Sequence, residues 1–145
     1  MASEPMHVEL VSPERILYSG EATMVTCRTL GGGDIAFLPG HAPFLGALTE
    51  GVVRITLPGG GIEVAAVHGG FVQVAGNKVS ILSDVAEMAD QIDLARAEQA
   101  KAEAEAHLRH EHHEHDAECE ATLRRAHARI SAAGGLPAGQ PRSAH

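Results

Sequence analysis

The sequence predicts an all-β plus α protein, in which an N-terminal antiparallel β-sandwich, or flattened barrel, precedes a C-terminal antiparallel two-helix hairpin. Thirteen of the sixteen glycines lie before Asn77, among short runs of β-forming residues. After Asp84 the chain becomes alanine-rich, and its apolar residues recur at helical spacing. We expect a sandwich over residues 1–87, a hairpin over 88–133 with helices at about 91–108 and 116–133, and a disordered tail over 134–145.

Nine runs in the first part have the length and composition of β-strands. Residues 53–57 alternate between apolar and polar side chains, which is the two-residue period of a strand with one buried face. The turns at 58–61 (P-G-G-G) and 75–78 (A-G-N-K) are typical of hairpins, because Gly and Asn tolerate left-handed backbone conformations. Many short strands at this spacing favour a sandwich or barrel. The expected strands span 6–11, 15–19, 22–30, 34–38, 44–48, 52–57, 62–67, 71–75 and 79–82.

A type II turn is expected where the strand at 34–38 ends. Pro39 has no N–H to donate to a strand ladder, and Gly40 supplies the φ > 0 that the second central position of this turn requires. Pro43 keeps Ala42 out of the α region. His41 is therefore expected at an exposed loop tip.

The helical part begins with D-Q-I-D at residues 90–93, which resembles a capping box. Asp90 is expected to accept hydrogen bonds from the first N–H groups of the helix, and Asp93 lies near the positive end of the helix dipole. A hairpin of such small and polar helices needs the sandwich or a partner to pack against. The expected apolar stripes are Ile92, Ala95, Ala102 and Ala106 in the first helix and Cys119, Leu123, Ala126, Ile130 and Ala133 in the second.

The composition excludes several classes of protein. Nineteen acidic and eleven basic residues give a formal charge of −8, and no basic stripe appears, so no nucleic-acid partner is expected. No window reaches the roughly 18 apolar residues of a membrane span, so membrane association is expected only through partners. The first residues lack the basic and apolar regions of a signal peptide. Cys27 and Cys119 lie far apart and are expected to be reduced.

Motifs of known enzyme classes do not occur in the sequence. There is no G-x-S-x-G, P-loop or H-E-x-x-H pattern, and the glycines at 31–33 are followed by neither a helix nor a lysine. A small hydrolase that used His41 with Asp34 would lack a nucleophile. We therefore expect a non-catalytic protein with no cofactor.

A histidine cluster supports a rival hypothesis, a metal-binding or metallochaperone module over residues 107–115. The i,i+3 spacing could place His107 and His110, or His110 and His113, on one helical face, where their imidazoles would attract Zn²⁺ or Ni²⁺. A structural zinc site also needs fixed geometry and supporting partners, so the alternative is a solvated polar loop between the helices. In acid these histidines would make the segment cationic.

Four stretches of the sequence match one protein family. They are G-D-I-A-F-L-P-G-H-A-P (33–43), V-S-P-E (11–14), G-G-F-V-Q-V (69–74) and V-S-I-L-S-D (79–84). On these residues the chain resembles the epsilon subunit of F-type ATP synthases, and the match runs nearly end to end. The family fold, a flattened β-sandwich followed by two helices, agrees with the change of period described above.

The resemblance implies a rotor subunit of a proton- or sodium-translocating ATP synthase. It implies that the sandwich binds the gamma subunit and the c-ring. It also implies that the hairpin either folds onto the sandwich or extends along gamma towards the alpha and beta subunits and restrains ATP hydrolysis. The expected location is the cytoplasmic face of a bacterial plasma membrane, as a peripheral part of the complex.

Particular residues acquire roles from the same resemblance. Asp34 and His41 match family positions that face the c-ring, with solvated turn residues as the alternative. Asp93 and Arg96 match the I/L-D-x-x-R-A motif that binds regulatory ATP in some members, and the alternative is a local pair at i,i+3. Glu103 and Glu105 on the same helix would repel phosphate. The expected contacts with the catalytic head are Arg124, Arg125 and Arg129.

Overall fold

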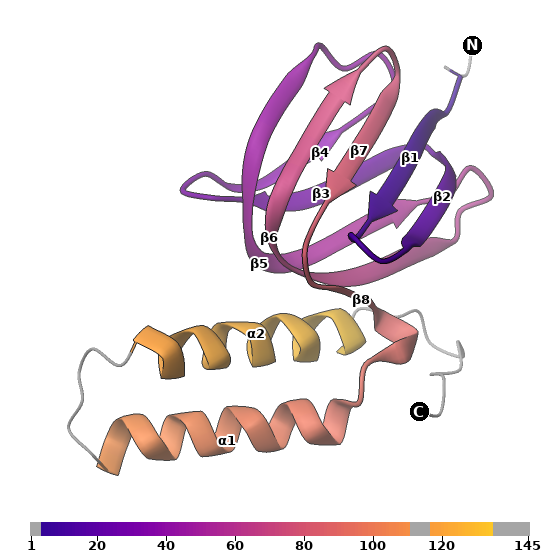
Figure 1. Ribbon diagram of the computed structural model, residues 1–145. Helices are drawn as coiled ribbons and strands as arrows, with labels where there is room; N and C mark the ends of the chain where they lie inside the picture. Colours follow the sequence, from indigo (N-terminus) through magenta and orange to yellow (C-terminus); the bar gives the residue numbers. More distant parts are fainter. Residues whose placement is uncertain (1–3, 111–116, 135–145) are drawn as a thin grey trace.

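The computed structural model describes residues 4–110 and 117–134, which form a β-sandwich with two helices beneath it (Figure 1). The predicted fold class is confirmed. The strands are β1 (Met6–Val11), β2 (Ile16–Ala22), β3 (Met24–Thr29), β4 (Gly33–Phe37), β5 (Phe44–Thr56), β6 (Ile62–Ala75), β7 (Lys78–Leu82) and β8 (Ala86–Met88). A 3-10 turn (Ala89–Gln91) leads to α1 (Leu94–His110) and α2 (Ala117–Gly134).

The strands follow one hydrogen-bonded path in the order β2-β1-β7-β6-β5-β3-β4, and β8 pairs with β6. Among the described residues, β1 and β7 run parallel, and the other pairs are antiparallel. The long strands β5 and β6 curve near the helices, so the path folds back on itself and closes a core (Figure 1). Alternate side chains fill that core, and the largest fully buried ones are Phe37, Met6, Leu10, Ile55 and Ile81.

The strand count differs from the prediction because two pairs of predicted strands are continuous. Residues 44–48 and 52–57 both belong to β5, and residues 62–67 and 71–75 both belong to β6. The intervening T-E-G and H-G-G segments resemble turns in the sequence, yet Leu48 pairs with Gly70 and Glu50 pairs with His68. Cross-strand pairing thus carries both strands through the bend. The short strand β8 was not predicted.

Gly70 makes the bend in β6 sterically possible. Its φ is +122°, a value that side-chain-bearing residues rarely adopt, and an added Cβ would collide with the carbonyl oxygen of Leu82. The Ser83 hydroxyl donates to the carbonyl oxygens of Gly69 at 2.7 Å and Val85 at 2.9 Å. The end of β7 is therefore fixed tightly against the bend. Gly40 likewise has the positive φ, +84°, that the predicted turn requires.

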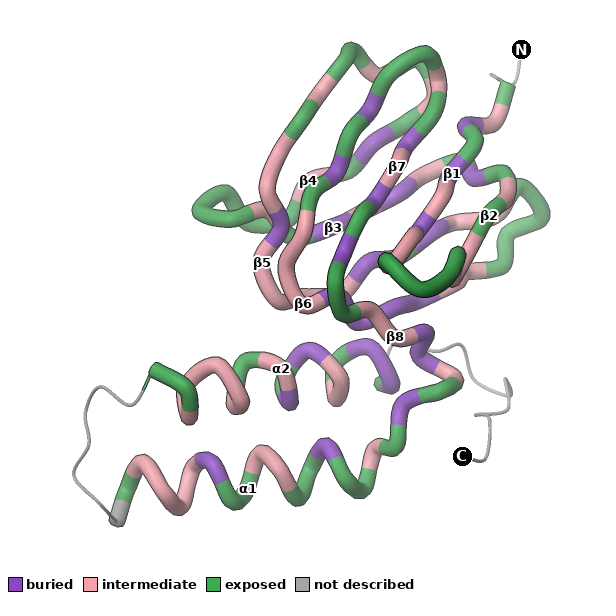
Figure 2. The backbone as a smooth tube through the Cα atoms, in the orientation of Figure 1, coloured by how far each residue is buried: buried purple, intermediate pink, exposed green. Residues whose placement is uncertain are grey.

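Helix α2 lies between α1 and the sandwich (Figure 1). Four alanines of α2 are buried, namely Ala126, Ala128, Ala132 and Ala133, and the last three pack against the sandwich. Helix α1 is mostly exposed or half-buried (Figure 2). Small side chains on both surfaces let the backbones come close, so the hairpin packs through a thin apolar layer. That layer consists of Val64 and Ala66 of β6, Ala89, Ile92, and Ala128, Ala132 and Ala133 of α2.

The predicted helix start and the predicted stripe of α1 were wrong in detail. Asp90 lies in the 3-10 turn, and Asp93 caps α1 instead. Ala95 and Ala102 are exposed, while Ala97 and Ala104 are buried. Because alanines occur on every side of this helix, its sequence does not define one apolar face, and packing against α2 selects the buried one.

In α2 the predicted residues Ala126 and Ala133 are buried, and the Cys119 thiol lies 3.4 Å from the Ala104 carbonyl oxygen of α1. A second buried side, which includes Ala128 and Ala132, faces the sandwich and was not predicted.

The predicted disordered tail from residue 135 onwards and residues 111–116 lie outside the described residues. Within the described ranges, no helix combines the length and apolarity needed to cross a membrane.

We expect Gly70→Ala to lower the free energy of unfolding by about 2 kcal/mol, since it adds both backbone strain and a collision with Leu82. Urea denaturation of the full chain measures this change. The control is Gly59→Ala, because a Cβ at Gly59 meets open space and its φ is ordinary. Equal denaturation midpoints for the two variants would contradict the steric role of Gly70.

Candidate functional site

An ion pair connects the hairpin to the sandwich. Arg129 of α2 donates from Nε to Glu87 Oε1 of β8 at 2.8 Å, and a terminal guanidinium nitrogen lies 2.7 Å from the same oxygen. Both side chains are about 30% exposed. The neighbouring His68 ring and the Arg129 guanidinium lower the pKa of Glu87 to about 2, although burial acts in the opposite direction. Glu87 is therefore ionised throughout the physiological range.

A second ion pair lies further along α2. Arg124 Nε is 3.5 Å from Glu50 Oε2 of β5, and the Thr49 hydroxyl donates to the same oxygen at 3.1 Å. Burial acts to raise the pKa of Glu50, but the backbone N–H, Thr49 and Arg124 outweigh it, and the pKa is lowered. We call the residues Glu50, Glu87, Arg124 and Arg129 the hairpin contact.

His68 lies beside the hairpin contact and was not singled out by the sequence. Its side chain is only 3% exposed, and its Nε2 is 3.6 Å from Glu87 Oε1, longer than a hydrogen bond. Neither ring nitrogen has a hydrogen-bond partner among the described residues. The sequence signal for this residue is a histidine that directly follows the apolar run V-A-A-V at residues 64–67.

The predicted head-contact arginines have different surroundings. Arg124 and Arg129 belong to the hairpin contact, whereas Arg125 donates to the Thr122 hydroxyl at 3.3 Å within α2. In the docked hairpin, two of the three guanidinium groups are thus already paired with carboxylates of the sandwich.

The two predicted c-ring residues are not close neighbours. Asp34 pairs with Arg28 Nε at 3.2 Å and lines a cavity of about 420 Å³ that also borders α2. His41 is half-buried rather than exposed, because its ring packs edge-on against Phe37 with centroids 5.0 Å apart. The backbone N–H of the preceding residue, Gly40, donates to the side-chain oxygen of Asn77. Asn77 belongs to the β6–β7 turn, which lies at the end of the sandwich away from the helices (Figure 1).

Asp93 acts as the N-cap of α1. Its Oδ1 accepts from the backbone N–H of Arg96 at 3.1 Å, and its carbonyl oxygen accepts the first helical hydrogen bond, from Ala97 at 3.0 Å. The Arg96 side chain is exposed. The structure therefore brings these two residues together through a backbone contact rather than through a side-chain pair.

The predicted metal ligands fall largely outside the described part of the chain. His107 lies near the end of α1, whereas His113 and the side chain of His110 are not among the described residues. Within residues 4–110 and 117–134, no group of three His, Cys, Asp or Glu side chains is arranged to hold a metal ion.

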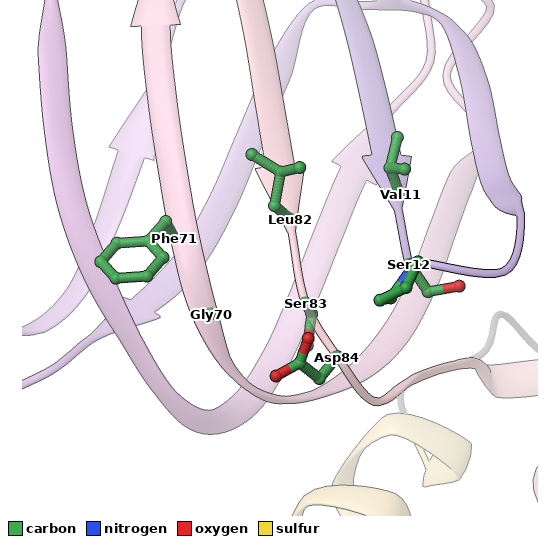
Figure 3. A pocket seen from close by; sticks show the side chains of 8 residues that line it. Val11, Ser12, Gly70, Phe71, Leu82, Ser83 and Asp84 are labelled. Carbon is green, nitrogen blue, oxygen red and sulfur yellow. The ribbon is translucent and has the colours of Figure 1, made fainter.

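An apolar row crosses the outer face of the sheet. The strand register places Ala47, Phe71, Leu82 and Val11 side by side on β5, β6, β7 and β1. Phe71 is 57% exposed and Leu82 is 51% exposed. Figure 3 shows Phe71, Leu82 and Val11 beside a pocket of about 390 Å³, with Ser12 and Asp84 at its lower edge. Contiguous exposed apolar side chains of this kind mark surfaces that bind other proteins.

These features define the class of protein: a β-sandwich and helical-hairpin subunit that acts through protein contacts. Residues 5–89 match the family model described as the β-sandwich domain of the ATP synthase delta/epsilon chain. Residues 90–134 match its long α-helix domain. The chain belongs to this family, as the sequence resemblance predicted.

Curated relatives support the epsilon assignment within that family. The ATP synthase epsilon chain of Streptomyces griseus is 53% identical over 100 residues, which cover 69% of this chain and 79% of the relative. That of Brevibacillus brevis is 45% identical over 96 residues, covering 66% and 72%. Such chains are non-catalytic subunits of the central stalk of a membrane-bound complex.

A solved structure shares the fold at low sequence identity. A chain of the Euglena gracilis mitochondrial ATP synthase, in a structure of OSCP, F1 and the c-ring, matches with a TM-score of 0.77 and 21% identity. The match covers 92% of this chain and 82% of that chain.

We expect Asp93→Ala to destabilise α1 by about 1 kcal/mol, because the N–H of Arg96 would lose its capping partner. Hydrogen exchange of the amides in the first turn of α1 measures this loss. Asp90→Ala is the control, since the Asp90 side chain caps no helix. If Asp90→Ala accelerated exchange more than Asp93→Ala, the capping assignment would be wrong.

Proposed function

We propose that this chain is the stalk subunit that connects the c-ring to gamma in a proton- or sodium-translocating ATP synthase, and that its hairpin regulates ATP hydrolysis. The observation that carries the proposal is the match of both parts of the chain to the delta/epsilon family over residues 5–134. The two surfaces described above give each part a physical means of acting.

The apolar row is the proposed contact with gamma. Phe71 and Leu82 expose more than half of their side chains to water, and covering them with a partner would be favourable. Burying a Phe or Leu side chain fully stabilises a contact by about 1.5–3 kcal/mol. The row lies on a sheet rather than on a loop, so its side chains are held in fixed positions before gamma binds.

The c-ring contact is assigned to the loops that flank β4. Three large apolar residues are exposed around Asp34 and His41: Leu30, Leu38 and Leu45, at 70%, 54% and 72%. Polar groups set among exposed leucines suit a surface that packs against another protein. Because Asp34 and His41 do not touch, we propose that they meet the ring at separate points of one wide contact.

The hairpin contact suggests how regulation operates. Arg124 and Arg129, which the family resemblance directs towards the alpha and beta subunits, are paired with Glu50 and Glu87 while the hairpin is docked. An arginine cannot make both contacts at once, so the sandwich and the catalytic head compete for the same helix. Half-exposed ion pairs contribute only about 0–1 kcal/mol each, which keeps this docking reversible.

The proposed location is the cytoplasmic face of a bacterial plasma membrane, where the subunit is held peripherally through the complex. The Streptomyces and Brevibacillus relatives support a bacterial source. Regulatory ATP binding by Asp93 and Arg96 stays a prediction, and so does metal binding by the histidines at 107–115.

Gamma binding tests the stalk assignment. We expect Phe71→Glu to weaken binding of the full chain to isolated gamma by roughly ten- to a hundredfold, because it places a charge in the apolar row. Ile16→Glu is the matched control, since Ile16 is an equally exposed apolar residue, at 62%, on the edge strand β2. If the folded wild-type chain bound no gamma, the stalk proposal would be abandoned.

ATP hydrolysis by the reconstituted complex tests the regulatory role. The double variant Glu50→Gln/Glu87→Gln removes the charges that hold α2, so we expect slower hydrolysis than in the wild type. Arg124→Ala/Arg129→Ala also releases α2 but removes the groups that would contact the head, so we expect no slowing. Glu98→Gln, on the exposed side of α1, is the control. Equal rates in both double variants would contradict the regulatory role.

A further inference from the structure

His68 is a buried titratable group that none of the assigned roles uses. Its side chain is only 3% exposed, and both ring nitrogens lack hydrogen-bond partners among the described residues. Leaving buried polar atoms unpaired costs about 1–3 kcal/mol. A residue with this cost at the interface between the sandwich and the hairpin calls for a functional explanation.

Charged groups surround His68 from three elements. Glu50 is its cross-strand partner on β5, and Glu87 of β8 lies 3.6 Å from its Nε2. Helix α2 brings Arg129 onto Glu87 and Arg124 onto Glu50. Two further titratable groups of α2, Arg125 and His127, lie between these arginines in the sequence. Arg125 is hydrogen-bonded to the Thr122 hydroxyl. His127 is exposed and lines the same cavity as Glu50.

We propose that His68 makes docking of the hairpin sensitive to pH, so that proton uptake by its imidazole releases α2 from the sandwich. This inference rests on the proposed function only for its consequence in the complex. The release itself is a property of the isolated chain.

Docking of α2 changes the surroundings of the His68 imidazole in two ways. The ring is almost fully buried, so an imidazolium would lose its hydration. In the docked state Arg124 and Arg129 share the carboxylates of Glu50 and Glu87 with the imidazole, so each carboxylate attracts an imidazolium less than it would without its arginine. The imidazolium and the two guanidinium groups would also repel one another across Glu87 and Glu50.

The released state favours a charged imidazole for the converse reasons. Lifting α2 removes both arginines and exposes the ring to water. Protonated His68 then lies beside two unpaired carboxylates, Glu50 across the ladder and Glu87 on β8. Because protons bind better to the released state, mass action requires that added protons increase its population. Release would free Arg124 and Arg129 for the catalytic head as the cytoplasm becomes acidic.

An imidazole and the Glu87 carboxylate change charge in different pH ranges. Imidazole side chains change charge between about pH 5 and 8. The pKa of Glu87 is lowered from 4.5 to about 2, so its contribution to docking is complete above pH 4.5 and is lost only as the pH falls towards 2. A release observed at mildly acidic pH therefore does not arise from protonation of Glu87.

Nuclear magnetic resonance of the isolated full chain tests the inference. The Nε–H signal of Arg129 reports its bond to Glu87, and contacts between the methyl groups of Ala132 and Ala66 report packing of α2 on β6. Between about pH 7.5 and 5.5 we expect the released-to-docked ratio to rise by up to about tenfold per pH unit, the limit for one proton.

Three variants decide the result. His68→Leu should remove the pH dependence and keep α2 docked, because a leucine fills the site without unpaired polar atoms. His127→Leu, which changes an exposed histidine of α2, should titrate like the wild type. Glu87→Gln should release α2 at neutral pH as well. An unchanged pH dependence in His68→Leu, or its absence in the wild type, would overturn the inference.

Failure of this inference can be told apart from failure of the proposed function. If Glu87→Gln releases α2 but the wild type stays docked down to pH 5.5, His68 is no switch, and the regulatory role of the hairpin stands. If α2 stays docked in Glu87→Gln as well, the ion pairs do not control docking and both fail. Should His68→Leu be unfolded, His68→Gln, which is neutral at every pH used, carries the same expectation.

Discussion

The pairing of β5 with β6 is the constraint on which the rest of the structure depends. These two strands are the longest in the described chain, and they carry β3 on one side and β7 on the other. Helix α2 packs on both of them as well. Their bend at Gly69 and Gly70 is held by close approach of the β7 end, so the positions of the neighbouring elements follow from it.

The same bend separates two surfaces with different chemistry. Before it, β6 contributes Ala66 and His68 to the side covered by α2. After it, β6 contributes Phe71 to the exposed apolar row. A permanent contact suits the apolar row, because its energy comes from excluding water and depends little on pH or salt. The ionic contact with α2 suits reversible docking, because its energy is small and sensitive to charge.

Docking of the hairpin thus depends on a thin apolar layer, in which five of the seven buried residues are alanines, and on two ion pairs. Alanine buries little apolar area, so the layer orders α2 without fixing it strongly. The orphan nitrogens of His68 weaken the docked state further. An element of low local stability is the kind of element that can change position during function. The ion pairs between the acidic residues of the sandwich and the arginines of α2 fix the position of α2 when it is docked.

The sequence by itself determined the fold class, the turn at Gly40, the existence of two helices and the family, because each of these depends on local pattern. Only the tertiary structure decided that the segments around residues 49–51 and 68–70 continue strands, since cross-strand pairing overrides turn-like composition. The tertiary structure also decided that Asp93, and not Asp90, caps α1 and which side of α1 is buried. The tertiary structure also decided which residues pair with Arg124 and Arg129 and that His68 is buried. These contacts are made by residues far apart in the chain; Arg129 and Glu87, for example, are 42 positions apart. No local pattern encodes such contacts, because they exist only once the helix has folded back onto the sheet.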